Sequence, residues 1–310
     1  MTLLERTWAV VVGWNSRETL SRALESLVDG GVAASRTVLV DNASTDGSPA
    51  EARGRFPDLV VIQNARNLGF GAAANQGARE ALARGARAVF FLNDDAWLEP
   101  GALPTLAAVL AGNPRVGAVG PRILFPGPPA RVWAAGGVLG GANLSTLRGN
   151  GRPDGARWQD TVAVDYVPGC ALLARAELLE ELDGFEEAYF AYMEDVELGV
   201  RSARSGWLAL CVGEASCRHD ASRSTGRGYS ARRKYMNGVN AIHFLRTHGR
   251  PVDWARLVVL DVLVLPFAWI AGLPRGRGRA VLAKGLGMLH GALGRRVVAE
   301  RLEPGGTALW

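Results

Sequence analysis

The first 120 residues repeat one pattern, in which a short apolar run is followed by a segment with helical spacing. Five runs have the length and composition of buried strands: 8–14, 37–40, 59–62, 88–92 and 116–119. The segments between them are 19–28, 47–56, 71–83 and 103–110. In 19–28 the apolar residues recur every three or four positions, as in an amphipathic helix. The alternation predicts an α/β fold with a mostly parallel central sheet flanked by helices.

Polar residues follow the first four predicted strands at the point where each strand ends. They are Asn15, Asp41-Asn42, Asn64 and Asn93-Asp94-Asp95. In open α/β sheets, ligands bind beyond the carboxyl ends of the strands. We therefore expect a ligand site at this edge of the sheet.

The second part of the chain is predicted to build a different half of the same domain. The proline- and glycine-rich segments 126–129 and 136–155 predict loops and edge strands. Regular secondary structure is expected again at 162–173, with helices near 175–182 and 194–204. A strand at 207–212 would lead to a polar loop that contains Cys217, Arg218 and His219. We expect one domain over 1–235, with halves 1–120 and 121–235.

The C-terminal segment 236–310 differs in charge and hydropathy. From position 218 onward the chain has 16 Arg and Lys against 5 Asp and Glu, a surplus of 11, whereas 1–217 has 19 against 25. The stretch 257–273 is strongly apolar but short for a membrane span, and arginines follow it. This pattern predicts helices that lie on a membrane surface. A helical tail packed on the domain is the alternative. No zinc-finger or aromatic-interleaved basic patch indicates nucleic acid.

The cysteines and the N-terminus predict a cytoplasmic protein. Cys170, Cys211 and Cys217 have no CxxC spacing, which suits a reducing compartment. Residues 1–12 lack the pattern of a signal peptide. With the basic segment, the expected location is the cytoplasm, peripheral on the inner face of the membrane.

Two acidic pairs and one histidine are candidates for chemistry. Asp94 and Asp95 would repel each other unless a divalent cation, held also by substrate phosphates, shares the site. Glu194 and Asp195 open a predicted helix, whose N-terminus would keep a carboxylate ionised as a proton acceptor. His219 could bind Mn²⁺ as a neutral imidazole. Each also has a plain structural interpretation, namely a turn, a helix cap and a surface-loop histidine.

Two glycine-containing turns could contact a nucleotide. The turn 41–47 could reach a base or ribose, or simply cap the next helix. The segment 67–71 leads from a strand into a helix and could face phosphate or ribose. It matches neither GxGxxG nor the Walker pattern, which argues against a dinucleotide site or an ATPase loop.

The order of the motifs is more specific than any one of them. They are VVVGWN, VLVDNASTDGS, NLGFGAAANQG, FLNDDAWLEPGAL, VGAVGPRIL, VPGCALLARAELLEELDGF, YMEDVELGVRSARSGW and HDASRS. Over residues 7–225 the series resembles the family 2 glycosyltransferases, in particular their bacterial rhamnosyltransferase-like branch. The resemblance implies the GT-A fold, in which a Rossmann-like nucleotide-binding half and an acceptor-binding half share one sheet.

The resemblance also implies roles for individual residues. Asp95 would bind Mg²⁺ or Mn²⁺ with His219, and Asp195 would be the catalytic base, supported by Glu194. The residues implied for the nucleotide-sugar site are Asn15, Asp41, Asn67, Gly69, Asn93 and Asp94. Two departures from the common pattern are Asn93, which replaces an acid, and Glu197, where aspartate is common.

The implied reaction is a single displacement with inversion at the anomeric carbon. The first expectation for the donor is dTDP-rhamnose, ahead of UDP- and GDP-sugars. The acceptor would be a hydroxyl of a cell-envelope glycan or a lipid-linked sugar. Three alternatives remain open at this stage: a nucleotidyltransferase, which would release pyrophosphate, a non-catalytic nucleotide- or carbohydrate-binding protein, and a retaining transferase.

Overall fold

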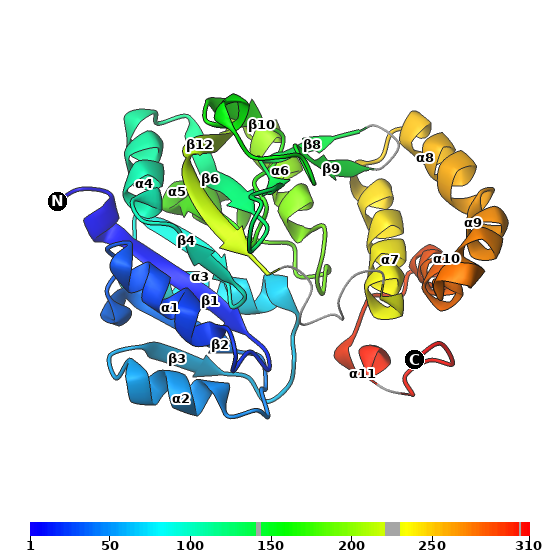
Figure 1. Ribbon diagram of the computed structural model, residues 1–310, viewed down its shortest axis with the longest axis horizontal. Helices are drawn as coiled ribbons and strands as arrows, with labels where there is room; N and C mark the ends of the chain where they lie inside the picture. The colour runs from blue at the N-terminus through cyan, green and yellow to red at the C-terminus, as the bar shows by residue number, and fades with distance from the viewer. Residues whose placement is uncertain (141–143, 221–229, 304) are drawn as a thin grey trace.

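The protein is built on one mixed sheet, with a group of C-terminal helices beside it (Figure 1). The structure, a computed structural model, describes residues 1–140, 144–220, 230–303 and 305–310. Within these residues the sheet has ten strands, and its main path runs β10-β12-β6-β11-β4-β1-β2-β3. The strands are β1 Thr7–Gly13, β2 Thr37–Asp41, β3 Val60–Gln63, β4 Ala88–Asn93, β5 Ala96–Leu98, β6 Val116–Leu124, β7 Val132–Ala134, β10 Thr161–Val164, β11 Ala171–Arg175 and β12 Leu208–His219. A separate hairpin pairs β8 (Gly137–Leu139) with β9 (Ser145–Leu147).

The N-terminal half of the sheet is parallel, as the alternating pattern predicts. Strands β3, β2, β1 and β4 run in one direction. Strand β11 then lies antiparallel between β4 and β6, and β12 returns parallel to β6. The antiparallel β11 brings the residues just before it, 167–170, to the carboxyl end of β4.

Helices cover both faces of the sheet because successive side chains of each strand point to opposite faces. The residues Ala9 and Val11 of β1 pack on the face covered by α1 (Leu20–Asp29), α2 (Ser48–Arg55) and α4 (Ala102–Gly112). Val10 packs on the other face, under α3 (Phe70–Ala83), α5 (Ala176–Leu182) and α6 (Glu194–Arg204). These layers confirm the predicted fold class.

One sequence expectation about the second half is wrong. The strand predicted at 207–212 continues to position 219, so Cys217, Arg218 and His219 form the end of β12 rather than a polar loop. The reason is that the short strand β5 pairs with this end and supplies its hydrogen-bond partners, with Ala96 opposite His219. Residues 221–224 of the HDASRS motif lie outside the described part of the chain.

The C-terminal helices are α7 (Ala231–His248), α8 (Pro251–Leu257), α9 (Leu265–Gly272), α10 (Gly278–Ala292) and α11 (Ala299–Leu302). Helix α7 starts before the boundary expected at 235 and packs against α10. With a π-helical segment at Val258–Val262, the helical run Pro251–Arg275 reaches 25 residues, and its most apolar window has a mean hydropathy of 2.2. It is therefore longer than the apolar stretch seen in the sequence, and by length and composition alone it could cross a membrane. Only 11% of its most apolar window is buried.

Candidate active site

The polar strand ends meet at one edge of the sheet, as expected. In the parallel register Gly13 lies beside Asp41, Asp41 beside Gln63, and Val12 beside Asn93. A pocket of about 460 Å³ opens at this edge. The wall formed by the strand ends and the loops after them comprises Val12, Trp14, Asn42, Ala43, Ala65, Arg66, Asn67, Gly69, Phe70, Asn93 and Asp94.

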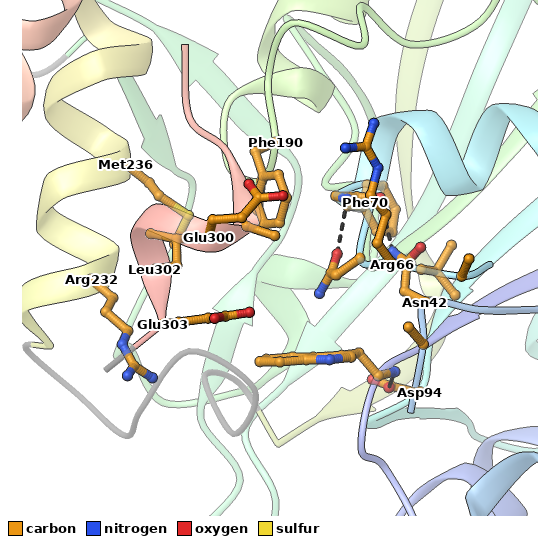
Figure 2. Close-up of a pocket in the computed structure, with 18 of the residues that line it drawn as sticks. Asn42, Arg66, Phe70, Asp94, Phe190, Arg232, Met236, Glu300, Leu302 and Glu303 are labelled. Atoms are coloured by element: carbon orange, nitrogen blue, oxygen red, sulfur yellow. Dashed lines mark hydrogen bonds between the residues drawn. The ribbon is translucent and has the colours of Figure 1, made fainter. Parts of the chain in front are cut away.

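The opposite wall comes from parts of the chain that the sequence did not associate with this site. It comprises Phe190 and Ala191, Arg232 and Met236 of α7, and Ala299, Glu300, Leu302 and Glu303 at α11. Figure 2 shows Arg232, Met236 and Glu303 across the pocket from Asn42, Phe70 and Asp94. No local motif marks these residues, because they reach the pocket only through the packing of the C-terminal helices.

The C-terminal tail is held in this position by the buried Tyr235 of α7. Its hydroxyl accepts a hydrogen bond from Arg301 (3.1 Å), and its ring contacts the Trp310 ring at a centroid distance of 5.5 Å. The Trp310 indole N–H donates to the Arg301 carbonyl (3.1 Å). These contacts fix α11 as a wall of the pocket.

Asn67 and Gly69 both line the pocket, and the structure gives the glycine a steric role. The Asn67 Oδ1 accepts the Gly69 N–H (2.9 Å), which closes the turn before α3. Gly69 has a φ of +86°, and a Cβ there would lie 2.4 Å from the Phe190 carbonyl oxygen. Phe70 N–H donates to that same oxygen (2.6 Å). Glycine is therefore required for the two walls to approach each other.

Asn15 and Asp41 lie at the same edge but are not among the lining residues. The buried Asp41 carboxylate accepts the Ser44 N–H (3.2 Å). The exposed Asn15 accepts the Thr45 N–H (2.8 Å). Both side chains thus shape the turn 41–47, and their contact with a donor stays a prediction.

Asn93 and Asp94 face the pocket from the end of β4. The Asp94 carboxylate accepts the Trp14 N–H (3.1 Å), which ties the ends of β1 and β4 together. Burial, followed by the charge of Asp95, raises the pKa of Asp94 to about 7. The negative charge of Asp94 is therefore costly in this place unless a cation joins it.

Asp95 and His219 form the candidate metal pair, and the pairing of β5 with β12 brings them together. Both are buried, and the Asp95 Oδ1 lies 3.0 Å from the His219 Nε2. The contact is not a hydrogen bond, since Asp95 Oδ1 has no hydrogen-bond partner, and neither has His219 Nδ1. Two neighbouring ligands of an octahedral ion at about 2.1 Å lie about 3.0 Å apart. The pair therefore fits a small divalent cation. Within the described residues no third His, Cys, Asp or Glu completes the cluster, so phosphate oxygens or water would supply the other ligands.

Glu194 and Asp195 stand at the start of α6. The Asp195 carboxylate accepts the Gly169 N–H (2.9 Å), whereas the buried Glu194 Oε2 has no hydrogen-bond partner. Burial, with the charge of Asp195, raises the pKa of Glu194 to about 8. Burial also raises the pKa of Asp195, against the N–H groups of Gly169 and Val196. Desolvation therefore opposes the stabilisation expected from the helix N-terminus, and the ionisation of Asp195 stays a prediction. The N–H donors favour the charge on Asp195 and the proton on Glu194.

The two acidic pairs occupy the same end of the sheet. Asp195 binds the Gly169 N–H, and the carbonyl of the next residue, Cys170, accepts the Asn93 N–H (3.0 Å). Burial raises the pKa of the Cys170 thiol well above its usual value, and the charges of Cys217, Asp95 and Asp195 add to this. Asp95 and Asp195 thus both lie close enough to Cys170 to act on its thiol, although neither lines the pocket as described above.

The candidate site is thus a pocket at the parallel strand ends of a mixed α/β sheet, with two acidic pairs beside it. The family model for Glycosyl transferase family 2 matches residues 8–182, which is more than half of the chain. The protein belongs to this family, whose members transfer sugars from nucleotide-sugars.

Individual relatives narrow the comparison. The chain is 32% identical over 246 residues to N-acetylglucosaminyl-diphospho-decaprenol L-rhamnosyltransferase of Mycobacterium tuberculosis, covering 70% of this chain and 77% of that one. The fold resembles that of a mannosyltransferase from Pyrobaculum calidifontis in complex with GDP-Man and Mn²⁺, at a TM-score of 0.57, 18% identity and coverage of 94% and 88%. It also resembles the structure of GalNAc-T7 with UDP, GalNAc and Mn²⁺, at a TM-score of 0.57 and 16% identity. This match covers 72% of this chain and 44% of that one. These structures support the GT-A fold.

Proposed function

We propose that the protein is an inverting, metal-dependent glycosyltransferase that moves a sugar, first of all rhamnose from dTDP-rhamnose, to a hydroxyl of a lipid-linked or cell-envelope glycan. One observation carries this proposal. The candidate base Asp195 and the pair Asp95–His219 lie at the same end of the sheet, linked through Gly169 and Cys170, beside the pocket at the strand ends.

In this proposal the two walls of the pocket bind different parts of the donor. The strand-end wall, which includes Trp14, Asn67 and Asn93, surrounds the nucleotide. Arg66 and Arg232 bring positive charge to the diphosphate from opposite sides, and Arg232 has no carboxylate partner among the described residues. Asp95 and His219 would hold Mg²⁺ or Mn²⁺, which when bound neutralises the charge that develops on the leaving diphosphate.

Asp195 accepts the proton of the attacking hydroxyl. The Gly169 N–H fixes its carboxylate and leaves lone pairs free for the acceptor. Glu194, with its raised pKa, stays protonated near neutral pH and avoids a second negative charge beside the base. The attack then occurs on the face of the sugar opposite the diphosphate, which inverts the anomeric configuration.

The proposed acceptor class rests on the relative and on the C-terminal helices. The mycobacterial relative is named for a diphospho-decaprenol acceptor. The helical run Pro251–Arg275 exposes large apolar side chains, among them Phe267 (71%) and Ile270 (60%). Such a surface, followed by arginines, suits a peripheral position at the inner face of the membrane, where a lipid-linked acceptor is available.

A thermal-shift screen of nucleotide-sugars with and without Mn²⁺ tests the donor and the metal together. With Mn²⁺ present, we expect dTDP-rhamnose to raise the Tm more than any other nucleotide-sugar does. Without the metal, the same donor should raise the Tm only slightly. The selected donor is then incubated with a lipid-linked N-acetylglucosamine acceptor, and the anomeric proton spectrum of the product is recorded. Retained configuration would contradict inversion. A second donor that shifts the Tm more than dTDP-rhamnose would overturn the donor assignment but not the reaction class.

A further inference from the structure

A second, smaller cavity lies between α7 and the end of α10, away from the residues that form the candidate active site. Its volume is about 140 Å³, many times the space that one water molecule needs. It is lined by Ala188, Val239, Asn240, His243, Arg246, Gly291, Gly294, Arg295 and Arg296. We call it the basic pocket, because three arginines and a histidine line it and no acid does.

Among the described residues, no carboxylate lines the basic pocket or forms an ion pair with its arginines. The Arg246 guanidinium donates to the carbonyls of Gly291 (3.0 Å) and Ala292 (2.7 Å), which anchors α7 to the end of α10. Arg295 and Arg296 have no carboxylate partner among the described residues, and the Arg295 guanidinium lies 3.3 Å from the His290 Nε2. Burial and the positive charge of Arg296 lower the pKa of His243, against the opposing negative charges of Glu186 and Glu197. The pocket therefore carries a positive potential suited to an anion.

The basic pocket borders the apolar surface of the C-terminal helices. Leu289 and Leu293, one turn apart at the end of α10, are 56% and 60% exposed. They directly precede the segment Gly294–Arg296 that lines the pocket. An apolar surface with arginines at its border is typical of a segment that lies at the level of lipid headgroups.

The basic pocket also adjoins the segment that separates it from the larger pocket at the strand ends, which we call the donor pocket. Ala188 lines the basic pocket, whereas Phe190 and Ala191 line the donor pocket. The buried Asn240 side chain donates to the carbonyls of Ala191 (2.8 Å) and Tyr192 (2.7 Å), just before Glu194. A group bound in the basic pocket would therefore sit one chain segment away from the donor pocket.

We propose that the basic pocket binds a phosphate ester carried by a membrane lipid, with Arg295 and Arg296 as its principal ligands. This inference rests on the membrane attachment in the proposed function. Two lipids offer the same chemistry, namely the diphosphate of a polyprenyl-linked acceptor and the headgroup of an anionic phospholipid. Arginine pairs with the oxygens of either through its planar array of N–H donors.

The test is vesicle co-sedimentation of the full chain. The vesicles contain phosphatidylcholine alone, with phosphatidylglycerol, or with a polyprenyl diphosphate. The variant Arg295→Gln/Arg296→Gln removes two charges from the pocket. The control Arg275→Gln/Arg279→Gln removes two exposed charges from the same C-terminal helices but outside the pocket. Both pairs are exposed at the surface, so both variants are expected to fold.

We expect one or both phosphate-bearing lipids to bind the unmodified protein more tightly than phosphatidylcholine. Because each arginine near a membrane surface contributes about fivefold in affinity, both variants should lose affinity, and the pocket variant should lose about tenfold more than the control. Preference for the polyprenyl diphosphate would assign the site to the acceptor, and preference for phosphatidylglycerol to the bilayer. Equal losses in the two variants would overturn the proposal. No gain from either lipid would contradict membrane attachment, and it would overturn the pocket as well if a soluble phosphate ester also fails to bind.

A soluble probe separates this proposal from membrane attachment. Short-chain phosphatidylglycerol below its micelle concentration is added in a thermal-shift assay with the donor pocket saturated by nucleoside diphosphate. A Tm rise that requires Arg295 and Arg296 supports the pocket even if vesicles do not bind. Conversely, Phe267→Ser/Ile270→Ser should abolish binding to every vesicle while leaving this soluble response intact. Loss of the soluble response in that variant would contradict an independent pocket.

Discussion

Replacement of Asp195 by asparagine tests the proposed base directly. Asparagine keeps the size of the side chain and an oxygen that accepts the Gly169 N–H, now 2.9 Å from Asp195 Oδ2. It removes the ability to take up a proton. Positioned general bases contribute about 10²- to 10⁴-fold, so we expect kcat to fall about 10³-fold, equivalent to about 4 kcal/mol.

The same substitution should leave the fold and the donor pocket intact. A hydrogen bond to a charged acceptor contributes about 1.5–3 kcal/mol and a neutral one about 1 kcal/mol. The loss is offset because the variant no longer buries a carboxylate whose pKa burial raises. The free energy of unfolding should therefore change by about 1 kcal/mol or less. Donor binding should not change, since Asp195 does not line the pocket.

The assay is the initial rate of nucleoside diphosphate release, with the donor chosen by the thermal-shift screen and saturating acceptor. Donor affinity is measured separately by the nucleotide-dependent Tm shift. Glu194→Gln should lose less activity than Asp195→Asn, because Glu194 already holds a proton near neutral pH. Glu180→Gln, on the exposed side of α5, controls for the loss of an acid. If Asp195→Asn stays within tenfold of the unmodified enzyme while Glu194→Gln loses more, the base is Glu194 and the reasoning is wrong.

Four further predictions concern other parts of the site. Because the pKa of Glu194 is raised, its contribution to stability is greatest at low pH and is lost as the pH rises toward about 8. Between pH 6 and pH 9, the free energy of unfolding of Glu194→Gln in urea should therefore rise by up to about 3 kcal/mol relative to that of the unmodified protein. A difference that stays constant with pH would contradict this. His219→Gln should weaken Mn²⁺ binding in the presence of nucleoside diphosphate at least about tenfold by calorimetry; unchanged affinity would remove His219 from the metal site. Gly69→Ala should lower the free energy of unfolding by about 2–4 kcal/mol, because of the φ of +86° and the 2.4 Å approach of a Cβ to Phe190. The control Gly85→Ala has a φ of +85° but open space around the Cβ, and should lower it by about 1 kcal/mol. Equal losses would exclude the Phe190 contact as the cause. Deletion of residues 298–310 should raise the KM for the donor several-fold with little effect on the acceptor KM, since α11 forms a wall of the pocket; an unchanged donor KM would contradict that role.

The parallel half of the sheet and its ligand edge could be predicted because their signals are local. A buried parallel strand is apolar along its whole length, and polar residues begin where it ends, as at Asp41 and Asn93. The start of α6 at Glu194 was found for the same reason, since helical spacing begins there. Such signals need only neighbouring residues.

The proximity of the two candidate metal ligands could not be predicted from local sequence signals. The sequence suggested both Asp95 and His219, but it assigned His219 to a loop. Only the pairing of β5 with β12, 123 positions apart at Ala96 and His219, brings these two residues opposite each other and so places Asp95 3.0 Å from the His219 ring. A three-residue strand such as β5 has too little pattern of its own to be predicted.

The ionisation of Asp195 likewise depended on its surroundings. Its place at a helix N-terminus was visible in the sequence and favours the charged form. The burial that opposes this, and the proton held by Glu194, follow from tertiary packing around the pair, in which Gly169 contacts Asp195. A pKa is set by desolvation and nearby charges in three dimensions.

By itself the sequence determined the fold class, the strand ends that form the ligand edge and the residue types that perform the proposed chemistry. Tertiary structure alone decided that α7 and α11 close the donor pocket, that Gly69 must be a glycine, and that three arginines converge on a second cavity. The physical reason is that secondary structure follows from the periodicity of neighbouring side chains, whereas a pocket wall is formed by residues hundreds of positions apart. Trp14 and Glu303 share a pocket because whole helices pack, and no short segment of the chain records that contact.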